Sequence, residues 1–218
     1  MVEYRKNKGE LMQMIRTIAA QHGKYQINEY EVDISQRMRD YALSYAVKSE
    51  LFDAVDVFKE ILSDSDDKTP DGIVKTIRYS VQTLYLNQLA DIAFLSLLKE
   101  KGIEYTRSDN QLDIVSKNGL VITTIPEFRS NHKKISVSIH QIKNPNKNIF
   151  IGVKLNGQDD PADVKLTLWD SIKTATIKGY ADKDFLNNLP DSDFGQGIFK
   201  RWDFNRLMGI DALLNKLT

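Results

Sequence analysis

The sequence predicts an α/β protein of the α+β kind, with a central mixed β-sheet of about five strands flanked by helices and preceded by an N-terminal helical extension. Apolar residues recur at helical spacing through most of residues 1–101. After Gly102 the segments become short, β-branched and bounded by Asn, Gly, Pro and Lys, as strands are. The polar run SDSDDKTPDG at 63–72 is the best linker candidate. We therefore predict an N-terminal helical region over residues 1–72 and an α/β core over residues 73–218.

Helices are expected in the first half of the chain because apolar side chains keep a period close to 3.6 residues. Ser35 is a suitable N-cap, Gly102 a suitable C-terminal stop, and residues 24–34 are expected to form a connector. An acid, Asp91, interrupts the apolar surface of the last helix and either serves a site or faces a wet seam with Asn87 and Gln88. The spacing predicts helices over 3–22, 35–46, 50–62 and 73–101.

The second half of the chain is expected to be mainly β-structure. The predicted strands are IEYTR, LDIVS, LVITTI, KISVSIHQI and NIFIGVKL, followed by VKLTLWDS, TATIKGY and IFKRWDF. Asp182 is expected to cap a short helix, KDFLNNL, and residues 210–217 are expected to form a terminal helix. Residues 156–163 and 191–197 read as loops.

The segment Leu112 to Arg129, LDIVSKNGLVITTIPEFR, predicts a β-hairpin. Asn118-Gly119 between two β-rich runs is a strong hairpin signal, because both residues tolerate the positive φ of a type I′ turn. The hairpin would place Asp113 and Glu127 on neighbouring strands, with Arg129 two residues farther on. Two such carboxylates beside a cation are suited to hold a hard metal ion for phosphodiester chemistry.

Composition excludes several classes of function. The chain has no cysteine, so disulfides, thiolate-bound zinc and cysteine nucleophiles are excluded. Its three histidines form no metal-binding pair of the HExxH kind, and no phosphate-binding glycine loop is present. No signal-peptide core and no apolar run of about 20 residues occurs. We expect a soluble, intracellular protein of the cytoplasm with no membrane partner.

Charge is balanced overall but uneven along the chain. Thirty basic and thirty acidic residues cancel, yet the segment 128–158 contains no Asp or Glu. Such a basic strip favours a phosphate backbone as partner, although lysines that guard a solvated strand edge would give the same pattern. Trp169 and Trp202 could likewise stack on bases or simply fill a core. The candidate nucleic-acid-binding residues of the strip are Lys133, Lys134, Lys143 and Lys147, with Arg129 and Lys154 nearby.

Residues 84–217 resemble the PD-(D/E)XK nuclease superfamily, which includes restriction endonucleases and Holliday-junction resolvases. The likeness consists of an acid-bearing helix (LADIAFLSLLKEKGIEY), an Asp-led hairpin (LDIVSKNG, then a strand ending EFR) and the hydrophobic strand NIFIGVKL. TATIKGYADKDFLNNL and the terminal WDFNRLMGIDALL are similar to elements that follow the core in several such nucleases. The resemblance implies a restriction-endonuclease-like core.

The resemblance also implies roles for single residues. The family's hairpin acids fall on Asp113 and Glu127, its motif lysine on Arg129, and its helix acid on Asp91. In the family, such acids bind Mg²⁺ or Mn²⁺, and the lysine positions or activates the attacking water. Arginine keeps the charge but does not exchange a proton, because its pKa stays above about 12. Pro126 precedes Glu127, and strict strand alternation would instead direct Thr123 or Ile125 at the site.

Three functions follow from these expectations. The first is a metal-dependent DNA endonuclease, on branched or junction DNA in replication, repair or recombination. Asp91, Asp113 and Glu127 would hold its Mg²⁺ or Mn²⁺, Arg129 would clamp the phosphate, and the N-terminal helices would face DNA or form a homodimer. The second is a catalytically inactive nuclease-fold protein that binds nucleic acid or serves in assembly. The third is a helical interaction protein whose sheet has no nucleic-acid role.

Overall fold

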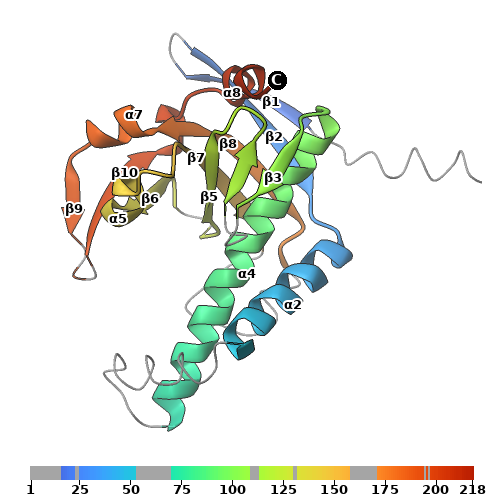
Figure 1. The fold of residues 1–218 in the computed structure, drawn as a ribbon, viewed down its shortest axis with the longest axis vertical. Coiled ribbons are helices and arrows are strands. Elements are labelled where there is room, and N and C mark those ends of the chain that lie inside the picture. Colours follow the sequence, from blue (N-terminus) through green and yellow to red (C-terminus); the bar gives the residue numbers. More distant parts are fainter. Residues whose placement is uncertain are drawn as a thin grey trace, which may run out of the picture.

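A computed structural model describes residues 16–22, 25–52, 70–108, 113–129, 132–157, 171–193, 195 and 197–218. These residues form an α+β fold with one large mixed sheet, a second small sheet, and helices packed around them (Figure 1). The long helix α4 (Pro70–Glu100) runs across the large sheet and continues past its edge, with α2 (Gln36–Phe52) beside it (Figure 1).

The large sheet has seven strands in the order β1-β2-β8-β7-β5-β4-β3. Every neighbouring pair is antiparallel except β5 and β7, which are parallel. The parallel pair is joined by a connection that contains β6 and α5. The strands are β1 (Arg16–His22), β2 (Tyr25–Asp33), β3 (Tyr105–Arg107), β4 (Ile114–Ser116), β5 (Val121–Glu127), β7 (Ile149–Asn156) and β8 (Thr174–Asp182).

One face of the large sheet packs against the major helices. Alternate residues of β7, from Ile149 to Leu155, join apolar side chains of the helices in the larger hydrophobic cluster. Buried residues of α4 such as Leu89 and Phe94 form its centre. The helices are α2 (Gln36–Phe52), α4 (Pro70–Glu100) and α8 (Ile210–Leu217).

The other face of the sheet packs against the small sheet, whose strand order is β6-β10-β9. Phe150 points into this second cluster together with Ile135 and Trp202. A Cβ on Gly152 would lie 2.8 Å from the Leu207 side chain, so the strand requires glycine there for the layers to pack this closely. The elements are β6 (Lys134–Ser138), α5 (Ile139–Lys143), α7 (Lys183–Asn187), β9 (Asp191–Asp193), β10 (Ile198–Asp203) and η2 (Phe204–Arg206).

Most of the predicted elements after residue 34 are confirmed. Helix α4 is continuous over its 31 residues, about 46 Å at about 1.5 Å per residue. The predicted helix cap at Asp182 is confirmed, because its side chain accepts a hydrogen bond from the Phe185 N–H at 2.9 Å. The predicted helices over 35–46 and 210–217 correspond to α2 and α8.

Several predictions are wrong. Of the helix expected over 3–22, residues 16–22 form strand β1 and the rest lies outside the described residues. The connector expected over 24–34, with at most a brief extended stretch, is the nine-residue strand β2. On β2, Tyr30 and Val32 alternate with less buried neighbours, as strand residues do. Because β1 pairs with β2 and β2 pairs with β8, tertiary pairing outweighs the helical spacing of residues 16–22. The large sheet therefore contains strands from before residue 72 and strands from after residue 73. It has seven strands, where about five were expected.

Two corrections concern the small sheet. The strand predicted over 134–142 ends at Ser138, whose hydroxyl accepts a hydrogen bond from the Gln141 N–H and so begins α5. Residues 191–193, expected in a loop, form β9.

The predicted strand VKLTLWDS falls almost wholly outside the described residues, as do Trp169 and most of the helix expected over 50–62. Among the helices of the described segments, none has the length and apolar composition needed to cross a membrane.

Candidate functional site

The predicted hairpin is present, but its turn differs from the prediction. Ile114 pairs with Ile122 and Val115 with Val121, and the Ser116 N–H donates to the Leu120 carbonyl at 3.0 Å. The loop therefore has three residues, 117–119, and ends in Gly119 at a φ of 80°. A three-residue loop ending in a left-handed glycine replaces the expected two-residue type I′ turn. Because the register shifts by one residue, Asp113 comes to lie opposite Thr123.

Asp113 sits at the start of this hairpin and is buried, with 6% of its surface exposed. Its Oδ1 accepts hydrogen bonds from Thr123 Oγ1 at 2.7 Å and from Lys147 Nζ at 2.9 Å. Lys147 Nζ also lies 3.1 Å from Thr123 Oγ1. An ammonium group and a hydroxyl thus neutralise and solvate a carboxylate that would be costly to bury alone.

Asp91 belongs to α4 and forms a second buried pair. Arg107 Nη1 donates to its Oδ2 at 2.7 Å, and Thr124 Oγ1 donates to its Oδ1 at 2.6 Å. Burial raises the pKa of Asp91, an effect that Arg107 and Thr124 oppose and the nearby Asp113 charge reinforces. Thr123 and Thr124 are adjacent on β5, so their side chains point to opposite faces of the sheet. The two acids therefore take their hydroxyl partners from opposite faces of one strand.

Glu127 lies at the other end of β5, four residues from Thr123, about 13 Å along the strand at about 3.3 Å per residue. Its Oε1 accepts a hydrogen bond from the Arg129 N–H at 2.8 Å, and its Oε2 lies 3.2 Å from His132 Nδ1. The exposed Arg129 side chain lies 3.4 Å from the same imidazole nitrogen. Glu127 and Arg129 are thus part of a loop cluster that is separate from Asp113.

Lys154 on β7 holds this loop cluster through hydrogen bonds to its backbone. Its Nζ donates to the carbonyl oxygens of Arg129 and His132. Burial lowers the pKa of Lys154, while the Glu127 carboxylate acts to raise it. Lys154 therefore holds the backbone of the loop rather than presenting its charge to solvent.

The predicted metal set of Asp91, Asp113 and Glu127 does not fit a divalent ion in this arrangement. A single Mg²⁺ keeps its oxygen ligands about 2.1 Å away, and Glu127 is far beyond that reach of Asp113. Oδ1 of Asp113 already lies 2.9 Å from the Lys147 ammonium. Across the part of the chain that the structure describes, no three His, Cys, Asp or Glu side chains converge in a way that would hold a metal.

The predicted basic strip divides into exposed and buried lysines. Lys133 and Lys134 at the start of β6, and Lys143 at the end of α5, are exposed. Lys147 is not, because its side chain is 13% exposed and engaged with Asp113. Three of the four predicted nucleic-acid-binding lysines therefore lie on the surface, on the connection between β5 and β7.

Sequence reasoning missed the cations that neutralise the two buried acids. Strand alternation directs Thr123 at the site, but its hydrogen bond to Asp113 also requires the correct loop length. Arg107 and Lys147 carried no local signal, because one lies 16 residues from Asp91 and the other 34 residues from Asp113. Such pairs are set by the topology of the sheet and not by spacing along the chain.

Comparisons with protein-family models, with curated proteins and with solved structures find no significant match to this chain.

Proposed function

We propose that this chain is a nucleic-acid-binding module built on a nuclease-like fold that does not hydrolyse its ligand. The observation that carries the proposal is the contact of Lys147 and Thr123 with Asp113. Asp113 is the residue that the resemblance would assign to a metal ion. A lysine ammonium supplies positive charge beside it but provides neither an open coordination site nor a metal-bound water.

The order of elements supports the nuclease-like part of the proposal. An acid-bearing helix, α4, precedes β3, the Asp-led hairpin β4 and β5, and then the hydrophobic strand β7. Strand β8 and the short helix α7 follow, as the resemblance implies for the segment after the core. All five strands are neighbours in one sheet, in the order β3-β4-β5-β7-β8.

The residues opposite Asp113 support the loss of hydrolysis. Alternation along β5 directs Thr123, Ile125 and Glu127 to the face where Asp113 lies; Thr123 and Ile125 are the two nearest to Asp113, and Ile125 is buried in the second hydrophobic cluster. Neither side chain carries a charge, so neither can act as a metal-binding acid or as the cation that positions water. Glu127 and Arg129 occupy a different place, at the far end of the strand.

The exposed lysines of the β5–β7 connection support a nucleic-acid ligand. Lys133, Lys134 and Lys143 are exposed within a segment that carries no acid. Contacts from such side chains to phosphates release counterions, so binding weakens steeply with salt and depends little on sequence. We expect each lysine that contacts a phosphate to contribute about 0.9 to the slope of log K against log salt on duplex DNA.

The test measures binding and cleavage with the same preparations. We expect the full chain to bind duplex or branched DNA at low salt without cutting it in Mn²⁺. The variant Lys133→Glu/Lys134→Glu should weaken binding and flatten the salt slope, whereas the matched variant Lys48→Glu/Lys173→Glu, at two exposed lysines outside the strip, should not. Mn²⁺-dependent cleavage that is abolished by Asp113→Ala and by Glu127→Ala would refute the proposal and establish a nuclease.

A further inference from the structure

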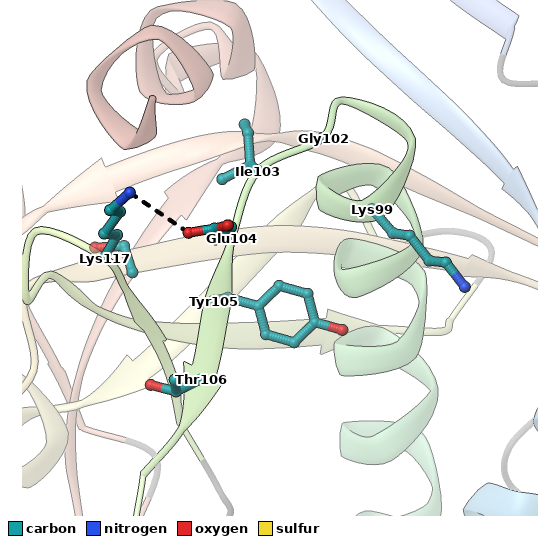
Figure 2. A pocket seen from close by; sticks show the side chains of 8 residues that line it. Lys99, Gly102, Ile103, Glu104, Tyr105, Thr106 and Lys117 are labelled. Atoms are coloured by element: carbon teal, nitrogen blue, oxygen red, sulfur yellow. Dashed lines mark ion pairs between the residues drawn. The ribbon is translucent and has the colours of Figure 1, made fainter.

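A hollow of about 660 Å³ lies where the end of α4 meets the edge strand β3 (Figure 2). Tyr105, 36% exposed, lies along its wall, with Lys99 on α4 and Lys117 in the hairpin loop. Figure 2 shows the Tyr105 ring extending from β3 toward α4, on the side of the strand where Lys99 lies. This hollow is separate from the Asp113 centre and has no role in the interactions described above.

Two of the residues that line the hollow with Tyr105, namely Ser116 and Gly102, are small. Tyr105 pairs across the ladder with Ser116, which is on the same face of the sheet and is too small to cover an aromatic ring. The Ser116 hydroxyl is turned into the hairpin loop, where the Leu120 N–H donates to it at 3.0 Å. Gly102, which ends α4 at a φ of 69°, adds no side chain. One face of the tyrosine ring is therefore left without a packed partner from the sheet.

The charges around the hollow favour an anionic ligand. Lys99 is exposed on one side of β3, and Lys117 is exposed on the other, 3.5 Å from Glu104. Because both members of that ion pair are more than three-quarters exposed, the pair is weak and Lys117 remains available to a phosphate. An aromatic ring between two lysines is the arrangement by which proteins hold single-stranded nucleic acid.

The backbone of β3 adds hydrogen-bonding groups at the same place. Strand β3 is the edge of the seven-stranded sheet, and the Ser108 N–H donates to the Asp113 carbonyl at 3.0 Å. Antiparallel ladders alternate, so Thr106 turns its backbone groups toward β4 and Tyr105 turns its own toward the open edge. Three residues make a poor template for adding a peptide strand, but one outward N–H and C=O suffice for the edge of a base.

We propose that this hollow is a subsite for single-stranded nucleic acid, in which a base stacks on Tyr105 and the flanking phosphates contact Lys99 and Lys117. The proposal rests on the proposed nucleic-acid-binding function and extends it to a strand that is not paired. It predicts a preference for single strands over duplex, because a stacked base inside a duplex cannot reach the ring.

The experiment measures anisotropy of a labelled oligothymidylate of about 12 nucleotides with the full chain at low salt. Tyr105→Ala should weaken binding by about 5- to 100-fold, and Tyr105→Phe, which keeps the ring, should bind like the unmodified chain. The matched control is Tyr79→Ala, which removes a tyrosine that is 68% exposed on α4. A probe of the same length with abasic sugars should bind the unmodified chain and Tyr105→Ala equally, because it has no base to stack.

Two results would overturn the subsite. Equal affinity of Tyr105→Ala for the thymidylate probe, while Lys133→Glu/Lys134→Glu still weakens binding, would reject the hollow and leave the proposed function standing. Displacement of the probe by an acidic peptide as readily as by unlabelled oligothymidylate would show recognition of charge without recognition of bases. Absence of any nucleic-acid binding at low salt would reject the subsite together with the proposed function.

Discussion

The acids that contact the middle of β5 and the acid at its C-terminal end have different partners. In the middle of the strand, Thr123 and Thr124 link it to Asp113 and Asp91, two acids that are each about 5% exposed and paired with a cation. At the C-terminal end, Glu127, whose side chain is 13% exposed, contacts His132, a residue of the adjoining loop that is 34% exposed at the side chain. Burial makes the first set interdependent, because no member can lose its partner without leaving an unpaired charge. The Glu127 carboxylate is supported instead by the Arg129 N–H, which donates to its Oε1 at 2.8 Å, and by an imidazole that is partly exposed.

The largest expected effect is at Lys147. Lys147→Met should destabilise the fold by about 3–5 kcal/mol, because it leaves the Asp113 carboxylate buried with only a hydroxyl partner. The double variant Lys147→Met/Asp113→Asn should recover most of that loss, since the uncompensated charge is removed. Urea unfolding followed by circular dichroism measures both. If the free energy of unfolding of Lys147→Met lies within about 0.5 kcal/mol of that of the unmodified chain, the Asp113 ion pair contributes no more to stability than the Glu127 contact.

A smaller loss is expected at Arg107, whose side chain is 26% exposed. Arg107→Met should cost about 1.5–3 kcal/mol, the range for losing a hydrogen bond to a charged group, because Thr124 still supports Asp91. Thermal unfolding of this variant beside Lys147→Met ranks the two ion pairs. If Arg107→Met lowers the free energy of unfolding more than Lys147→Met does, the solvent exposure of the cation does not determine the size of the loss.

The pH dependence of stability tests the burial of Asp91. Burial raises the pKa of Asp91 in the folded protein, so the folded state binds its proton more tightly than the unfolded state. The stabilisation from that proton is complete below the unfolded pKa of about 3.9 and is lost as pH rises through the folded pKa. Subtracting the urea midpoints of Asp91→Asn from those of the unmodified chain, from about pH 3.5 to pH 7, should reveal this decline. A difference that rises with pH would contradict the assignment.

The smallest effect is expected at Glu127. Glu127→Gln should change the free energy of unfolding by less than about 1 kcal/mol, because glutamine keeps an oxygen that can accept from the Arg129 N–H and the His132 partner is 34% exposed. Unfolding in 0.05 M and 0.5 M NaCl should give nearly the same small difference. A loss as large as that of Lys147→Met would mean that the loop cluster is as demanding as the buried centre.

Local patterns predicted much of the fold after residue 34, and failed where long-range pairing decides. The alternation in β7 and the caps at Asp182 and Gly102 are local, so they could be identified in the sequence. The register of the hairpin depends on one residue of loop length, which Asn118-Gly119 alone does not settle. That single residue decides whether Asp113 faces Thr123 or Thr124.

The candidate site shows the same limit more sharply. Asp113 and Asp91 were identified as acids in apolar surroundings, which is a property of their own segments. The cations that neutralise them come from distant segments that the sheet brings together. Glu127 was grouped with Asp113 because both flank the hairpin, yet strand length separates them.

The connection between β5 and β7 has an evolutionary consequence. It contributes the exposed Lys133, Lys134 and Lys143 to the surface and also delivers Lys147 to the buried carboxylate. Exchange of this one continuous stretch by recombination would alter the outer charge and the inner counter-charge in a single event. The surface charge of this region and the charge balance of its buried centre would then change together, without any change in the strands that form the sheet.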